Sequence, residues 1–130
     1  MKTLAEKVKA LLPMLEQRGA VYLFALFERE ETSGKWDIVL SSDWSDNERG
    51  DAVRLISDAL VPKLNPEEIS ALSRVFIAPS YDPAVEELIE ADQAQHVERF
   101  YTSGFSFMGV PIRQLYVFRT QKTPRVDVTV

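Results

Sequence analysis

The sequence has 130 residues, of which 45% are hydrophobic and 27% are charged, and its formal net charge is −5. A chain of this size and composition is typical of one globular domain with a sizeable hydrophobic core. Because it contains no cysteine and a single histidine, disulfide frameworks, cysteine nucleophiles, thiolate metal sites and centres that need two histidines are excluded.

The charge is unevenly distributed along the chain. Residues 1–95 contain ten basic and eighteen acidic side chains, a net charge of −8, whereas residues 96–130 contain five basic and two acidic side chains, a net charge of +3. The acidic body argues against general binding to nucleic acid. The two regions are expected to face each other, either within one domain or between two subunits.

The amino-terminal segment is charged throughout and has no apolar run of signal-peptide length. The longest apolar stretch, residues 20–27, is far shorter than the ~20 residues that a membrane helix needs. Together with the missing cysteines, this predicts a cytoplasmic protein that does not associate with membranes.

The first elements are expected to be one helix followed by a hairpin. Residues 3–6 read as a capping box at the start of a helix that ends near Gly19, and Pro13 is expected to kink or break it. Residues 20–27 are apolar on both alternate faces, which predicts a central strand covered on both sides. A polar loop then leads to a second strand at residues 36–40.

Three helices and one short strand are expected in the middle of the chain. A second capping box at residues 45–48 opens a helix that ends before Pro62. Residues 65–68 start a short helix, residues 74–78 form a brief strand, and residues 82–83 begin a further helix.

After residue 95 the hydrophobic pattern changes to a period of two. Strands are expected at residues 97–101, 105–108 and 112–119, with glycines at the bends. The resulting order, αββααβαβββ, predicts an α+β fold in a single domain, residues 1–130, with helices packed on a mixed, mainly antiparallel sheet.

The last residues, 120–130, are expected to be an extended tail or an exchanged strand. Val126, Val128 and Val130 alternate with polar residues, so the segment has one apolar face. Such a strand can pair with its own sheet edge, add to the sheet of a second subunit, or fray. These valines are therefore the candidate interface, and a homodimer or another protein is the expected partner.

The most polar segment follows the second strand. Asp37, Ser42, Asp43 and Asp46 are the candidate ligand-binding residues, because clustered carboxylates near a strand end and a helix start can hold Mg²⁺ and a phosphate. The competing interpretation is that these groups only stabilise the helix start. The spacing does not fit an EF-hand.

Asp37 is the least ordinary of these residues. A carboxylate inside an otherwise apolar strand must face solvent, pair with a cation or serve a site. Arg29 and Lys35 are the cations across the hairpin that can pair with it.

Several catalytic signatures are absent from the sequence. It contains no G-x-x-x-x-G-K, G-x-G-x-x-G or G-x-S-x-G motif. His96 has no identifiable nucleophile partner.

The segment from residue 21 to residue 40, with the later strand and helix at residues 75–90, resembles small nucleotidyltransferase-fold proteins of the minimal type. That resemblance covers about residues 1–95 and implies a nucleotide- and Mg²⁺-binding fold. Ala25 and Leu26 stand where the family has Gly-Ser, and Val39 replaces its second carboxylate. Because two-metal phosphoryl transfer needs several carboxylates, the resemblance implies a degenerate site.

The leading hypothesis is a non-catalytic, cytoplasmic protein-interaction domain without a cofactor. The first alternative is a nucleotide-binding protein with a degenerate nucleotidyltransferase-like fold, and Mg²⁺ is expected only in that case. The second alternative is an acidic, antitoxin-like protein that binds a partner.

Overall fold

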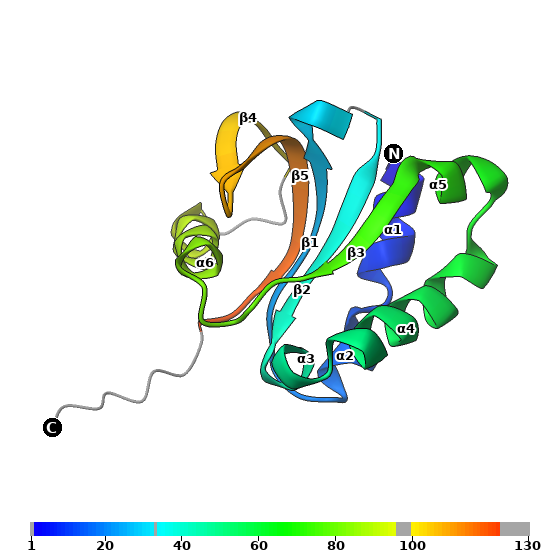
Figure 1. Ribbon diagram of the computed structural model, residues 1–130, viewed down its shortest axis with the longest axis horizontal. Coiled ribbons are helices and arrows are strands. Elements are labelled where there is room, and N and C mark those ends of the chain that lie inside the picture. The colour runs from blue at the N-terminus through cyan, green and yellow to red at the C-terminus, as the bar shows by residue number, and fades with distance from the viewer. Residues whose placement is uncertain (1, 33, 96–99, 123–130) are drawn as a thin grey trace, which may run out of the picture.

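The fold is a five-stranded sheet with helices on both faces (Figure 1). The computed structural model describes residues 2–32, 34–95 and 100–122. The elements in chain order are α1 (Lys2–Lys9), α2 (Leu12–Glu16), β1 (Val21–Arg29), η1 (Glu30–Thr32), β2 (Trp36–Ser42), α3 (Asp43–Asn47), α4 (Arg49–Leu60), η2 (Val61–Lys63), α5 (Pro66–Ala71), β3 (Leu72–Ile77), α6 (Pro83–Gln95), β4 (Phe100–Phe107) and β5 (Val110–Thr120).

The strands lie in the order β3-β2-β1-β5-β4. Strand β1 is central, and residues 21–28 are all buried, as the apolar pattern on both of its faces predicts. Among the described strands, three pairs are antiparallel, and only β2 and β3 are parallel. The predicted α+β class with a mixed, mainly antiparallel sheet is therefore confirmed.

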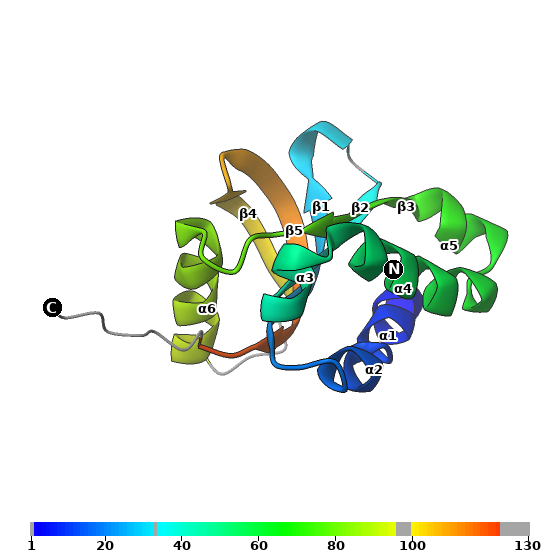
Figure 2. The ribbon, with the colours of Figure 1, turned by 60° about the horizontal axis from the view of Figure 1, so that its bottom comes forward.

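One face of the sheet is covered by α1, α2 and α4 (Figures 1 and 2). The largest buried cluster lies there, because alternate residues of β2 point toward these helices: Trp36, Ile38 and Leu40. From α4, Ala52, Ile56 and Leu60 are buried at helical spacing.

The opposite face is covered by α6 (Figure 2). Val85, Leu88 and Ile89 of this helix are buried against β1 and β5, as their spacing predicts. No residue of α6 lines the pocket described below, although that pocket shares residues such as Phe27 and Val39 with the cluster beneath the helix. None of the described helices has the length and apolar character needed to span a membrane.

Two helix starts differ from the sequence prediction. Helix α1 already includes Thr3, so the capping box expected there is wrong. Helix α1 ends at Lys9, before Pro13, and a second helix, α2, begins at Leu12. The capping box expected at residues 45–48 is also wrong, because Ser45 lies inside α3, whose N-cap is Ser42: the Ser42 hydroxyl accepts a hydrogen bond from the Ser45 amide at 3.1 Å. Helix α4 begins separately at Arg49 and has no side-chain cap. The capping box at residues 65–68 is confirmed, with Asn65 as the N-cap.

The end of the sheet also differs from the prediction. Two separate strands were expected at residues 97–101 and 105–108, but the structure has one strand, β4, with a register shift between Thr102 and Phe105. The glycine at position 104 therefore falls at an irregularity within a strand instead of a turn. The observed order contains one strand fewer than predicted.

Candidate functional site

Asp37 lies on β2, which is an interior strand of the sheet between β1 and β3. Its backbone pairs with Phe27 on one side and Arg74 on the other. Because β2 alternates, its side chain points away from Trp36 and Ile38, toward the face that α6 partly covers. Only 4% of the side chain is exposed, so a solvent-facing Asp37 is ruled out.

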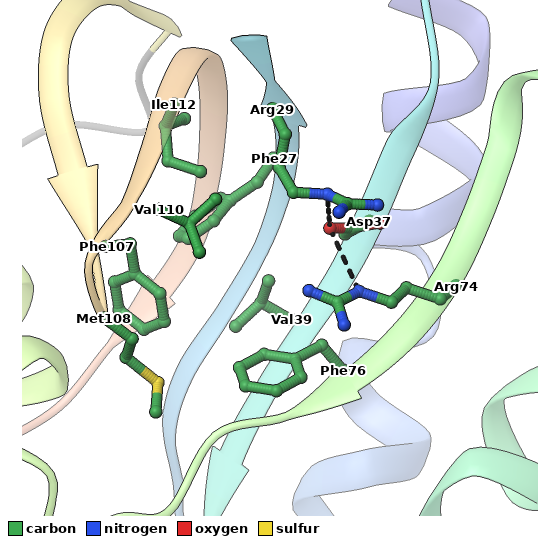
Figure 3. A pocket seen from close by; sticks show the side chains of 10 residues that line it. All are labelled: Phe27, Arg29, Asp37, Val39, Arg74, Phe76, Phe107, Met108, Val110 and Ile112. Atoms are coloured by element: carbon green, nitrogen blue, oxygen red, sulfur yellow. Dashed lines mark ion pairs between the residues drawn. The ribbon is translucent and has the colours of Figure 1, made fainter. Parts of the chain in front are cut away.

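Two arginines contact the same oxygen of this carboxylate (Figure 3). Arg29 Nε lies 2.9 Å from Asp37 Oδ2, and Arg74 Nε lies 3.3 Å from it. The predicted pairing of Asp37 with Arg29 is confirmed. Two cations beside a buried carboxylate compensate for the water that it has lost.

The two arginines differ in their other contacts. Arg29 is largely buried, and its two terminal nitrogens contact Glu31 Oε1 at 3.1 Å and Ser73 Oγ at 3.3 Å. The Arg74 side chain is 46% exposed, and its guanidinium carbon lies 4.8 Å from the centre of the Phe76 ring. Within the described parts of the chain, its terminal nitrogens have no hydrogen-bond partner, and neither does Asp37 Oδ1.

Beside this triad of Arg29, Asp37 and Arg74 lies a pocket with a volume of about 190 Å³. Most of its walls are apolar and include Val39, Phe76, Phe107, Met108, Val110 and Ile112. These residues come from four strands and the hairpin turn that joins β4 to β5 (Figure 3). The site therefore combines an apolar hollow with one half-exposed cation at its edge.

The hairpin turn places a strained residue at this pocket. Phe107 pairs with Val110, so the turn consists of Met108 and Gly109, whose φ angles are +51° and +80°. Positive φ at both central positions is typical of a type I′ turn, in which Asn or Gly normally comes first. Methionine has no side-chain reason to adopt this conformation, and Met108 is the one non-glycine residue with positive φ in the described chain.

The other candidate residues lie at the opposite end of β2. Ser42 caps α3, Asp43 Oδ2 accepts a hydrogen bond from the Tyr22 hydroxyl at 2.6 Å, and Asp46 accepts from both the amide and the hydroxyl of Ser80. Asp43 is six residues beyond Asp37, or roughly 20 Å along an extended strand. The structure thus brings Ser42, Asp43 and Asp46 into one loop cluster, but not together with Asp37.

The polar groups of this loop cluster are used in hydrogen bonds within the chain. Burial and the hydrogen bond to Asp43 raise the pKa of Tyr22 to about 12. Among the described residues, no group of three or more acidic or histidine side chains is placed to hold a metal ion.

The candidate interface residues, Val126, Val128 and Val130, lie outside the described residues, as does His96.

Sequence reasoning missed Arg74 and Met108. Arg74 lies beside Asp37 only through the pairing of β3 with β2, which is a long-range feature. The signal for Met108 was a methionine immediately before Gly109 at a predicted bend, a position where Asn, Asp or Gly is usual.

No protein-family model, curated protein or solved structure matches this sequence. The resemblance to nucleotidyltransferase-fold proteins therefore stays a prediction.

Proposed function

We propose that this protein is a non-catalytic binding domain that holds a small, largely apolar ligand in the pocket beside Asp37. One observation carries the proposal: a concave apolar site lies next to a cation whose terminal nitrogens lack a protein partner in the described chain. A mostly apolar hollow with a few convergent polar groups is the usual form of a small-molecule site.

The dimensions of the pocket support this proposal. A cavity of about 150 Å³ lined by apolar side chains is large enough to bind benzene. The pocket here is somewhat larger, about 190 Å³, and its walls come from strands of one sheet and from the turn between β4 and β5. A ligand of one ring with a small substituent fits such a space.

The state of the carboxylates supports binding in preference to catalysis. Asp37 Oδ2 lies 2.9 Å from Arg29 Nε and 3.3 Å from Arg74 Nε, so this carboxylate already has two cationic partners within the chain. Asp43 and Asp46 accept hydrogen bonds from Tyr22 and Ser80. This arrangement gives the Mg²⁺-nucleotide alternative less support than a site that binds an apolar ligand.

The test fills the pocket from a position that is not deeply buried. Val110 is half-buried and lines the pocket, so Val110→Phe is expected to occupy the space while leaving the fold intact. Val61→Phe is the control, because Val61 is 45% exposed and does not line the pocket. Binding of one-ring compounds is measured by calorimetry on the full chain.

The proposal predicts saturable binding of at least one such compound to the native protein and to Val61→Phe, and its loss in Val110→Phe. It is contradicted if no one-ring compound binds up to about 10 mM, or if filling the pocket leaves binding unchanged.

The protein-interaction hypothesis and the homodimer remain predictions, as does the cytoplasmic location. Light scattering on the full chain and on a chain ending at Lys122 tests the role of Val126, Val128 and Val130. A dimer that becomes a monomer on truncation would support the exchanged strand, and a monomer in both cases would contradict it.

A further inference from the structure

We infer that the ligand is an aromatic monocarboxylate, bound with its ring in the apolar hollow and its carboxylate on Arg74. This inference rests on the proposed function and adds the chemical class of the ligand. It draws on the charge of the triad, the geometry of Arg74, and the walls around Phe76, Phe107 and Met108.

The charge of the triad favours an anion that carries one negative charge. Among the residues that line the pocket, Arg29 and Arg74 contribute two positive charges and Asp37 one negative charge, so the polar wall has a net charge of +1. Glu31, which contacts Arg29, is 69% exposed and does not line the pocket. A monoanion neutralises this wall. A phosphate dianion would leave the site with a net negative charge. It would also lie close to the carboxylate of Asp37, which repels it.

Arg74 presents the group that carboxylates bind best. Its Nε is engaged by Asp37, and its terminal nitrogens extend toward Val39 and Phe76 (Figure 3). A guanidinium offers planar, paired donors that match the two oxygens of a carboxylate. Asp37 and the Phe76 ring fix the plane of the group, so Asp37 acts as a positioning residue.

The walls favour a planar ring over a flexible chain. Phe76 and Phe107 offer aromatic faces or edges, and Met108 adds a polarisable thioether, which makes favourable contacts with rings. The volume is close to that of cavities that hold a single benzene ring. The strained conformation of Met108 places this side chain on the pocket, which supports a role in contact with the ligand.

The experiment compares benzoate with benzamide, its neutral isostere, by calorimetry on the full chain and on Arg74→Gln. Because the guanidinium pairs with a carboxylate through two hydrogen bonds between opposite charges, whereas the amide of benzamide is neutral, benzoate is expected to bind about ten- to a hundredfold more tightly than benzamide. Arg74→Gln is expected to abolish that ratio, and Arg74→Lys to restore only part of it, since lysine keeps the charge but loses the paired donors.

The control variant is Arg54→Gln, which removes an arginine that is 74% exposed on α4 and does not line the pocket. It should leave the ratio of the two affinities unchanged. Circular dichroism establishes that each variant is folded.

Further compounds define the ligand class. Phenyl phosphate tests the single charge, and cyclohexanecarboxylate tests the planar ring; both are expected to bind less tightly than benzoate. Tighter binding of either compound overturns the assignment.

Failure of this inference is distinguishable from failure of the proposed function. If benzoate and benzamide bind equally, or Arg74→Gln leaves their ratio intact, the ligand class is wrong while the pocket still binds. If neither compound binds and Val110→Phe changes nothing, the proposed function fails and the inference fails with it.

Discussion

At the scale of single residues, the two arginines at Asp37 have different surroundings and are expected to have different energetic roles. Arg29 is largely buried and contacts three side chains, whereas the Arg74 side chain is 46% exposed. Removing one member of a buried ion pair leaves an under-compensated charge, whereas exposed pairs contribute little.

We therefore predict that Arg29→Ala lowers the free energy of unfolding by about 2–3 kcal/mol, and Arg74→Ala by less than about 1 kcal/mol. Urea unfolding monitored by circular dichroism measures both. An equal loss in the two variants would mean that Arg74 is a structural residue, which would weaken its assignment as the ligand-binding cation.

Tyr22 makes the stability of the fold depend on pH in the alkaline range. Its pKa is raised from 10.0 to about 12 by burial and by the hydrogen bond to Asp43. The unfolded chain loses the phenolic proton near pH 10, whereas the folded chain retains it. The stabilisation is therefore fully present below pH 10 and is lost as the pH rises from 10 to about 12.

We predict that native stability declines between these pH values and that Tyr22→Phe removes the Tyr22 contribution to the decline. The measurement is urea unfolding at a series of pH values, together with titration of the phenolate absorbance. Asp43→Asn is expected to lower the pKa of Tyr22, and an unchanged titration in that variant would refute the contribution assigned to the Asp43 hydrogen bond.

At the scale of elements, local preference and observed conformation disagree in the turn between β4 and β5. Met108 has a φ of +51°, a region that costs an L-residue with an ordinary side chain roughly 1–2 kcal/mol. Glycine carries no such penalty, although it also increases the freedom of the unfolded chain.

We predict that Met108→Gly raises the free energy of unfolding by up to about 1 kcal/mol and weakens benzoate binding, because the thioether wall is lost. Unfolding in urea and calorimetry give the two quantities. Gly109→Ala is the matched change in the same turn; it should destabilise the hairpin, since φ is +80° there. A Met108→Gly protein that binds benzoate as well as the native protein would remove Met108 from the site.

The elements themselves were mostly predictable, because they depend on local patterns. Hydrophobic periodicity identified β1, β2, α4 and α6, and the sequence Asn-Pro-Glu-Glu identified the start of α5. Helix starts were less accurate: Ser42 and Ser45 both suit an N-cap, and the choice between them depends on where β2 ends.

The site was only partly predictable, for a physical reason. The Arg29–Asp37 pair lies across a hairpin, so its sequence separation is short. Arg74 reaches Asp37 only because β3 lies parallel to β2 after a crossover through α3, α4 and α5. Strand order and register are set by long-range packing, which periodicity in one segment does not encode.

At the scale of the whole molecule, the opposite charges of the two regions meet within one chain. Arg119 contacts Glu16 at 2.7 Å, and Arg113 lies 3.8 Å from Glu28. Both arginines are on β5, and the two glutamates come from α2 and β1. The charge pattern thus has an explanation inside the domain and does not require a second subunit.

The two hydrophobic clusters share the central strand β1, so they are expected to unfold together. Phe24 and Leu26 belong to the cluster beneath α1, α2 and α4, while Leu23 and Ala25 belong to the cluster beneath α6. Both tryptophans lie in or against the first cluster, so their fluorescence reports mainly on that side of the sheet.

We predict that tryptophan fluorescence and far-ultraviolet circular dichroism give one coincident transition in urea. Ile89→Ala, which removes a buried side chain of α6, should shift both signals together by the equivalent of about 2–4 kcal/mol. If the fluorescence transition stays in place while circular dichroism shifts, the two sides of the sheet unfold separately.

The most direct test of the pocket is a benzoate titration of the isotopically labelled full chain followed by ¹H–¹⁵N NMR. We predict saturable shifts concentrated at the amides of Val39, Arg74, Phe76 and Met108, with small shifts at Asp43 and Asp46 at the far end of β2. Shifts concentrated at Asp43 and Asp46, or no saturable shift at the pocket, would contradict the assignment of this pocket as the binding site.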